Sequence, residues 1–283
     1  MAIDLHCHSK LSDGSMGIEE LMAVAKRRNL SAIAVTDHDT MASATRALTI
    51  GKRLGLRVIH GVEFSTWDSK RERKVHILCY ACDKPDRLEV LCRQVNDSRK
   101  KAAVEMIRKV MRYYPITPEL IAKCATGSTA IYKQHIMHAL MDAGYTDSIY
   151  GDVYNKLFGK ENGVIQTKVD YPDVREALEL IHSAGGVAVL AHPTLYNSEE
   201  LMEELVAEGL LDGIEAYHPS CTEEDTARLL AFAEQNKLVV TGGTDFHGMY
   251  TDVPRPLGSV SVPDDCADKL LAYKAAKSRA KGE

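Results

Sequence analysis

The stretch Asp4-Leu5-His6-Cys7-His8 carries two histidines two positions apart. Side chains on a β-strand alternate between its two faces, so His6 and His8 point to the same side if this stretch is a strand. Two imidazoles on one face offer neighbouring nitrogen ligands for a metal ion. An isolated pair of this kind would equally suit one packed and one exposed histidine, so the rest of the chain must decide.

Potential ligands recur where other strands are expected to end. We predict strands at Ile3–His8, Ala32–Asp37, Arg57–Ser65, Lys74–Tyr80, Val187–His192, Gly213–His218 and Leu238–Asp245. In or just after these strands lie His38, Glu63, His76, His192, His218, Asp245 and His247. In β/α barrels the active site is built at the carboxyl ends of the strands. This placement therefore favours a metal site over a set of separately packed histidines.

The fold expected from this pattern is an α/β barrel with an insertion. Helical patterns accompany the strands at Ile18–Arg28, Met41–Leu54, Pro172–Ala184, Ser198–Glu208, Glu223–Gln235 and Asp264–Lys277. Alternation of strands and helices predicts parallel strands with helices packed outside. The barrel would comprise residues 1–82 and 171–283. Residues 83–170 contain no convincing strand, start with a long helix over Asp86–Tyr113, and should form a helical insertion above the barrel.

Composition narrows the class of protein. The 283 residues are 45% hydrophobic and 27% charged, with a net charge of -5. This balance argues against electrostatic binding of long nucleic acid. No apolar run is long enough to span a membrane, and no secretory signal opens the chain. We expect a cytoplasmic protein with reduced cysteines, a small anionic substrate and no obligate protein partner.

The types of ligand limit the choice of metal. Histidine, aspartate and glutamate together suit Mn²⁺, Fe²⁺ or Zn²⁺. Cys7 alternates away from the face of His6 and His8 and is expected to be a small buried residue. Cys79 and Cys82 form a C-x-x-C, but no second pair stands at zinc-ribbon spacing, which disfavours a structural zinc or redox role.

These motifs resemble the PHP family, named for polymerase and histidinol phosphatase. The resemblance rests on DLHCH at Asp4–His8, TDHD at Thr36–Asp39, AHP at Ala191–Pro193 and TDFH at Thr244–His247, with GVEFS around Glu63 and KVHIL around His76. It implies a distorted (β/α)7 barrel with two or three divalent metal ions. Mn²⁺ is the expected ion, with Fe²⁺ or Zn²⁺ as alternatives. No expected ligand position is lost, which argues against a metal-free relative.

The resemblance also implies which residues hold each ion. The first ion would be held by His6, His8, Glu63 and Asp245, and the second by Glu63 as a bridge with His76 and His192. The third would be held by Asp13, His38 and His247. Asp13 lies in Ser12-Asp13-Gly14, where a plain turn residue is the alternative.

The insertion is similar to that of small nucleotide phosphatases within the family. Those enzymes remove the 3′-phosphate from nucleoside 3′,5′-bisphosphates, and some trim short RNA from its 5′ end. The segment Tyr132–Leu140 carries Lys133 where arginine is expected, which keeps the charge and loses bidentate geometry. Lys133 and His135 could bind a second substrate phosphate at a helix start. The alternative is a solvated lysine beside a packing histidine.

Two further residues are candidates for contact with the substrate. His218 could contact the phosphate or assist the leaving group, or it could be structural. Arg255 could reach the anion, although a surface arginine is the simpler interpretation. Asp37 and Asp39 flank His38 and could orient ligand imidazoles.

We therefore expect a metal-dependent phosphoesterase in which a metal-activated water attacks the ester. Its first predicted substrate is a nucleoside 3′,5′-bisphosphate, which loses the 3′-phosphate, with activity that could extend to short oligonucleotides. Another small-molecule phosphatase, such as one for histidinol phosphate, is the second hypothesis. A metal-stabilised accessory domain without turnover is the third.

Overall fold

A single sheet runs through the molecule, with helices packed around it. The structure is a computed structural model that describes residues 2–280 and 282. Within these residues the strands are β1 (Ala2–Cys7), β2 (Leu30–Val35), β3 (Arg57–Asp68), β4 (Arg73–Tyr80), β5 (Val187–Leu190), β6 (Gly213–Tyr217) and β7 (Val239–Gly242). All seven predicted strands are present, and they lie side by side in chain order.

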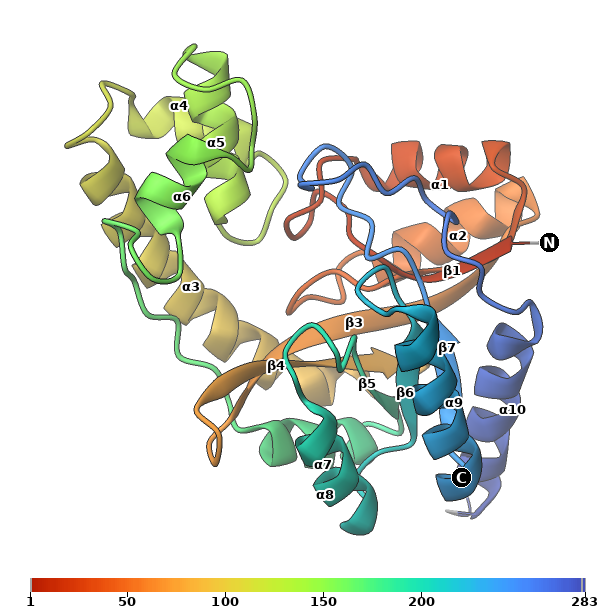
Figure 1. The fold of residues 1–283 in the computed structure, drawn as a ribbon. Coiled ribbons are helices and arrows are strands. Elements are labelled where there is room, and N and C mark those ends of the chain that lie inside the picture. The colour runs from red at the N-terminus through yellow and green to blue at the C-terminus, as the bar shows by residue number, and fades with distance from the viewer. Residues whose placement is uncertain (1, 281, 283) are drawn as a thin grey trace.

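The sheet curves until its first and last strands meet at one end. A parallel bridge pairs Cys7 with Phe246, and the His8 amide donates to the Phe246 carbonyl at 2.8 Å. The fold is thus an α/β fold with a distorted barrel, as expected (Figure 1). This closure places the end of β1 beside the loop that follows β7.

The expectation of parallel strands is wrong for β4, which runs antiparallel to both β3 and β5. Only residues 69–72 separate β3 from β4. A parallel pair needs a crossover connection of about a dozen residues or more, whereas a short loop joins antiparallel strands. The reversal has a consequence for the site. His76 lies in the first half of β4, paired in register with Ser65 of β3, and so reaches the same rim as the ends of the parallel strands.

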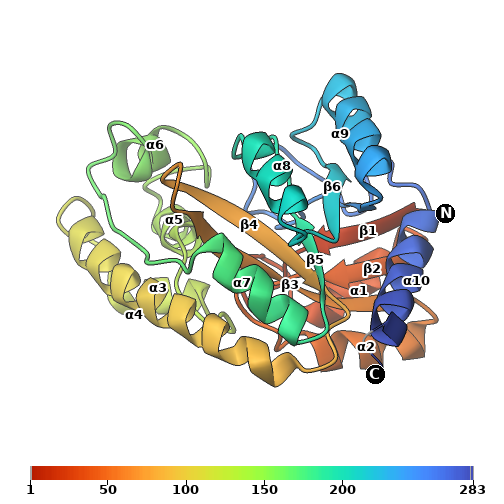
Figure 2. The same ribbon diagram turned by 90° about the horizontal axis from the view of Figure 1, so that it is seen from below.

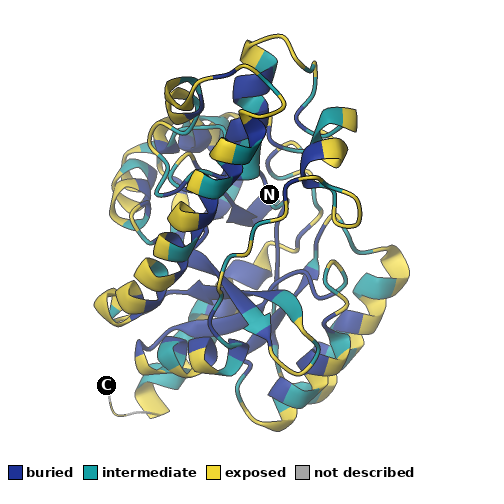
Figure 3. Cartoon of the chain, turned by 90° about the vertical axis from the view of Figure 1, so that its left-hand side faces the viewer, coloured by how far each residue is buried: buried dark blue, intermediate teal, exposed yellow. Residues whose placement is uncertain are grey.

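Helices surround the strands (Figure 2). They are α1 (Ile18–Arg27), α2 (Ala44–Leu54), α7 (Val174–Ser183), α8 (Glu199–Ala207), α9 (Glu223–Asn236) and α10 (Asp265–Ala280). Helix α2 begins three residues later than predicted, because the segment after β2 first forms the loop that carries His38. The strands are buried and the outer faces of the helices are exposed (Figure 3).

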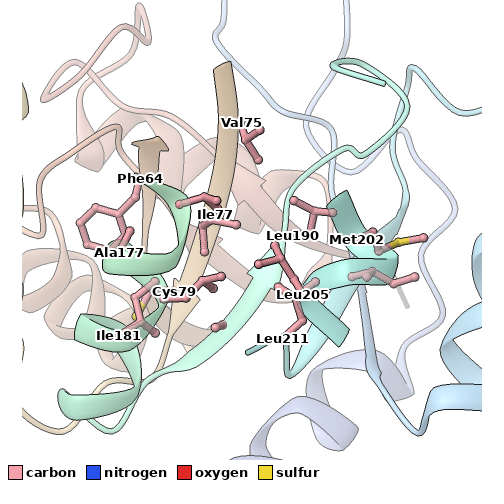
Figure 4. Close-up of a cluster of buried hydrophobic side chains, with 14 of the residues drawn as sticks. Phe64, Val75, Ile77, Cys79, Ala177, Ile181, Leu190, Met202, Leu205 and Leu211 are labelled. Atoms are coloured by element: carbon pink, nitrogen blue, oxygen red, sulfur yellow. The ribbon is translucent and has the colours of Figure 1, made fainter. Parts of the chain in front are cut away.

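The main apolar core lies between β3–β6 and the helices α7, α8 and α9. Phe64 and Ile77 pack there with Ile181 of α7, and Leu190 packs with Leu205 of α8 (Figure 4). Burying a side chain of this size contributes roughly 1.5–3 kcal/mol. The core thus fixes the strands whose ends carry the candidate ligands.

Between β4 and β5 the chain forms only helices and loops. These helices are the 3₁₀ turn η1 (Pro85–Leu88), α3 (Glu89–Val110), α4 (Pro118–Cys124), α5 (Lys133–Asp142) and α6 (Asp152–Phe158). The first turns of α3 pack on the barrel through Leu91, whereas Val110, Ile136 and Phe158 belong to a separate apolar cluster. Helix α3 therefore connects the barrel to the other helices (Figure 1). In the described residues, no helix is both long and apolar enough to cross a membrane.

Candidate metal centre

His6 and His8 do face the same side of β1. The Nε2 atom of each lies 3.1 Å from Oε2 of Glu63, at the middle of β3. The same two nitrogens lie 3.4 and 3.2 Å from Oδ1 of Asp245, just after β7. These four residues form a group whose potential ligand atoms lie within 4.8 Å of one another.

Glu63 lies at the centre of the cluster, and its two carboxylate oxygens face different imidazoles. Oε2 faces His6 and His8, together with His38 Nδ1 at 3.3 Å. Oε1 faces His76 Nδ1 at 2.6 Å and His192 Nε2 at 3.0 Å. A carboxylate placed in this way can span two cations.

A third group surrounds Asp13. Its Oδ1 lies 3.2 Å from Nε2 of His247, and its Oδ2 lies 4.0 Å from Nε2 of His38. Asp13 is buried and faces these imidazoles, rather than solvent as a plain turn residue would. With His8 they form another group within 4.8 Å. The structure thus brings together all nine residues proposed as ligands.

Several of these ligand atoms are buried and have no hydrogen-bond partner. They include Nε2 of His6, Nε2 of His8, Nδ1 of His38, Oδ1 of Asp13 and Oε2 of Glu63. A buried polar atom without a partner costs about 1–3 kcal/mol. Because so many of these atoms face the same place, we interpret it as a cation site, in which bound cations would supply the missing partners.

The pKa shifts of two imidazoles agree with this interpretation. Burial lowers the pKa of His8, but the carboxylates of Asp245 and Glu63 outweigh it and raise the value to about 10. Burial lowers the pKa of His76 to about 3. The carboxylate of Glu63 acts to raise this pKa, and the positive charge of Lys74 acts to lower it further. The negative charge around His8 therefore favours a cation, and without a metal ion a proton takes that place. His76 is in the neutral form that binds metal.

The backbone is strained at the same rim. Asp39, His192 and Asp245 have φ values of 52°, 26° and 50°, in the left-handed region that non-glycine residues seldom occupy. Such strain persists only where the surrounding structure enforces it, and it clusters at functional sites. Here it turns the chain sharply after a strand and directs ligand side chains inward.

Sequence reasoning missed Glu215 on β6. Its Oε1 accepts from His6 Nδ1–H at 2.9 Å, and its Oε2 accepts from the His192 amide at 2.9 Å. The first contact fixes the tautomer of His6 and leaves Nε2 to face the cluster. A charged residue inside an otherwise apolar, buried strand was the available signal.

The expected role of Asp37 and Asp39 is only partly met. Asp37 accepts from Ser12 Oγ at 2.8 Å, and that hydroxyl lies 3.5 Å from His8 Nδ1, so Asp37 reaches an imidazole through a serine. Asp39 bonds none of the imidazoles through its carboxylate. It accepts instead from Arg99 at 2.6 Å and from the Ser65 amide at 2.9 Å.

His218 lies at the edge of the cluster. Its Nδ1 accepts from the Ser220 amide at 3.1 Å, which leaves the proton on Nε2. That Nε2 is buried, has no hydrogen-bond partner and lies 3.5 Å from Asp245 Oδ2. An imidazole N–H directed into the site can donate to an anion.

The other predicted contacts lie farther out. Lys133 opens α5, with its Nζ 5.4 Å from the Phe158 ring. His135 is buried, its Nδ1 accepts from the Tyr132 amide at 3.1 Å, and burial lowers its pKa to about 4. Arg255 lies in the loop between β7 and α10, 3.5 Å from Asp252.

Two cations near the site were not anticipated. The Arg99 guanidinium lies 4.5 Å from the centre of the Tyr132 ring, and Lys74 Nζ lies 5.5 Å from that of Tyr171. Lys74 precedes His76 by two positions on β4, so the period of two could have placed it on the same face. Arg99 lies on α3, where no pattern in the sequence marked it.

A rim of imidazoles and carboxylates with unpaired ligand atoms, at one end of a distorted α/β barrel, defines a metal-dependent hydrolase. The PHP domain family model matches residues 4–184, and the chain belongs to this family.

Relatives of known activity are similar over nearly the whole chain. A phosphoribosyl 1,2-cyclic phosphate 1,2-diphosphodiesterase of Eggerthella lenta is 39% identical over 256 residues, 90% of this chain and 97% of that protein. A 5′-3′ exoribonuclease of Haemophilus influenzae is 31% identical, over 86% of this chain and 89% of its own. A 3′,5′-nucleoside bisphosphate phosphatase of Chromobacterium violaceum is 27% identical, over 87% of each chain.

A solved structure agrees with these matches. A Bifidobacterium adolescentis protein assigned as a metal-dependent phosphoesterase superposes with a TM-score of 0.85 at 27% identity, covering 96% of each chain. The protein is therefore an enzyme, a metal-dependent phosphoesterase. This excludes the hypothesis of an accessory domain without turnover.

Proposed function

We propose that the enzyme hydrolyses a phosphate ester on a ribose that carries a second phosphate group. Two relatives support this choice, because a phosphoribosyl cyclic phosphate and a nucleoside 3′,5′-bisphosphate each carry two phosphate groups on one ribose. The first substrate to test is the phosphoribosyl 1,2-cyclic phosphate, since that relative shares more of its sequence with this chain. The nucleoside 3′,5′-bisphosphate expected from the sequence is the second.

The observation that carries the proposal is a group of cations beside the metal centre. The positive charge of Arg99 acts to lower the pKa of Lys74. The pKa of Lys133 is lowered by burial and, in addition, by the charge of Lys74. These three side chains come from β4, α3 and α5. Arg99 is paired with Asp39, whereas the lowered pKa of Lys133 reflects a charge that its surroundings do not compensate. An anionic group of the substrate would stabilise that charge. The helices between β4 and β5 would thus supply part of the substrate-recognition surface.

The residues of the barrel rim would hold two or three divalent ions, with Mn²⁺ as the first choice and Fe²⁺ or Zn²⁺ as alternatives. His6, His8, Glu63 and Asp245 would hold one, Glu63, His76 and His192 a second, and Asp13, His38 and His247 a third. Bound divalent ions would neutralise the phosphate oxygens and lower the pKa of the attacking water.

The protein's own groups position the reaction. The carboxylate of Glu215 keeps His6 in the tautomer whose Nε2 faces the centre. His218 directs its Nε2–H toward the same place, where it can donate to a phosphate oxygen or to the leaving oxygen. Arg255, in the loop between β7 and α10, stays a candidate for contact with a part of the substrate away from the reacting phosphate. A cyclic phosphate needs two successive P–O cleavages to release inorganic phosphate, and one site can perform both.

The test is release of phosphate from a panel of substrates by Mn²⁺-loaded enzyme. The panel contains 5-phosphoribosyl 1,2-cyclic phosphate, adenosine 3′,5′-bisphosphate, AMP, histidinol phosphate and short 5′-phosphorylated RNA. We expect kcat/KM to be highest for one of the first two. A preference for histidinol phosphate or AMP would refute the requirement for a second phosphate. Prolonged chelation should abolish turnover and Mn²⁺ should restore it, and full activity in metal-free enzyme would refute the metal mechanism.

A further inference from the structure

A second group of potential metal ligands lies outside the barrel rim, on the helices between β4 and β5. It consists of Cys124 at the end of α4 and of His138 and Asp142, one turn apart on α5. One ligand atom of each lies within 4.8 Å of the others. The Cys124 Sγ lies 3.9 Å from Asp142 Oδ2, and His138 Nε2 lies 3.6 Å from Asp142 Oδ1.

The imidazole of His138 is held in the orientation that a ligand needs. Its Nδ1 lies 2.8 Å from the hydroxyl of Tyr250, in the loop after β7. This contact occupies one ring nitrogen and leaves Nε2, which lies 3.6 Å from Asp142 Oδ1, free to bind an ion. Metal-binding histidines nearly always bond a second group through the nitrogen that does not bind the metal. Tyr250 therefore supplies an observation independent of the proximity of the three ligands.

We propose that Cys124, His138 and Asp142 form a separate site for a borderline-soft divalent ion such as Zn²⁺. A thiolate, an imidazole and a carboxylate are the donors that Zn²⁺ accepts, and three protein ligands leave a fourth position for water. Asp142 is exposed and the other two are partly exposed, so an ion can enter from solvent.

Binding would exchange one proton for one ion. Burial raises the pKa of the Cys124 thiol to about 11, and Asp142 adds to the shift. Without the ion the thiol is therefore protonated, and the sulfur–metal bond forms as the S–H proton leaves to solvent. The affinity should rise with pH in consequence.

The ion would tie the helices between β4 and β5 to the loop after β7. It would join the end of α4 to α5, and through His138 it would fix Tyr250, three residues after His247. The Tyr250 ring also packs edge-on against His135, with centroids 5.7 Å apart. The site would thus stabilise the contact between α5 and the loop that carries Asp245 and His247.

Cobalt substitution tests the proposal, because a thiolate bound to Co²⁺ gives a near-ultraviolet charge-transfer band. None of the ligand groups at the barrel rim contains a cysteine, so Co²⁺ there gives no such band. We expect the band in wild type and in the control Cys92→Ser, and no band in Cys124→Ser. Elemental analysis after dialysis should find one cobalt fewer in Cys124→Ser and Asp142→Asn. Tyr250→Phe should weaken this site roughly 10- to 100-fold.

Three results would overturn the site. One is the absence of a band at saturating Co²⁺, and another is a band that persists in Cys124→Ser. The third is an unchanged cobalt affinity in Asp142→Asn, which would remove the carboxylate from the ligand set. None of these measurements depends on turnover, so they stand apart from the choice of substrate.

Discussion

Arg99 donates a hydrogen bond to Asp39 at 2.6 Å, although the two residues lie 60 positions apart and both are buried. Asp39 follows the candidate ligand His38, and Arg99 lies on α3. The guanidinium also lies 3.2 Å from Ser65 Oγ on β3. The Arg99 side chain of α3 thus holds the loop after β2 against β3, the strand that carries Glu63.

The first prediction concerns the energy of this ion pair. Removal of one partner from a buried pair leaves an uncompensated charge and costs about 3–5 kcal/mol. Arg99→Met should lower the free energy of unfolding by roughly that amount, and the double variant with Asp39→Asn should recover part of the loss. Urea unfolding measures both. The matched control is Lys100→Met, at a neighbouring exposed position, and an Arg99→Met loss no larger than this control would contradict the prediction.

Some parts of the fold and of the metal site could be predicted from the sequence, and others could not. The seven strands and most of the ligand residues follow from periodicity and from where histidines and carboxylates fall. Asp13 is assigned as a ligand only through the resemblance to the PHP family. The reversal of β4 could have been inferred, because the eight residues between the two predicted strands, 66–73, are too few for a crossover connection. Glu215 and Arg99 could not be assigned partners, because their contacts join segments 209 and 60 positions apart and depend on how the chain folds back. The second group of ligands, at Cys124, depends in the same way on how α4 packs against α5.

The second prediction tests whether Glu63 bridges two ions. Its two oxygens face different imidazoles, so Glu63→Gln should lower the number of bound metal ions by at least one and reduce the rate as well. Elemental analysis and turnover of the same preparation measure the two effects. The control is Glu203→Gln, which neutralises an exposed carboxylate on α8. Wild-type stoichiometry together with a wild-type rate would contradict the bridging role.

The third prediction assigns Glu215 a positioning role. Glu215→Gln keeps the size of the side chain but weakens the contact that orients His6. Loss of an outer contact of this kind typically costs roughly 10- to 100-fold in metal affinity. Competition with a chelator measures that affinity, and added metal should restore much of the turnover. If affinity is unchanged while turnover is lost, Glu215 acts on the reaction itself and not through His6.

The last prediction concerns Lys133, which opens α5 and whose pKa is lowered by burial and by Lys74 of β4. If Lys133 binds the phosphate that is not cleaved, Lys133→Ala removes one charge-assisted contact worth about 1.5–3 kcal/mol. The value of kcat/KM for adenosine 3′,5′-bisphosphate or the phosphoribosyl cyclic phosphate should then fall roughly tenfold to a hundredfold.

Use of a substrate with a single phosphate should change much less, because the metal centre alone holds the reacting group. The matched control is Lys160→Ala, which removes an exposed lysine after α6 whose charge acts on Lys133. It should leave the ratio of the two substrates unchanged. Equal fractional losses on both substrates in Lys133→Ala would show that this lysine does not recognise the second phosphate. Lys74 and Arg99 would then have to supply that recognition, and Lys74→Met would be the variant in which the ratio changes.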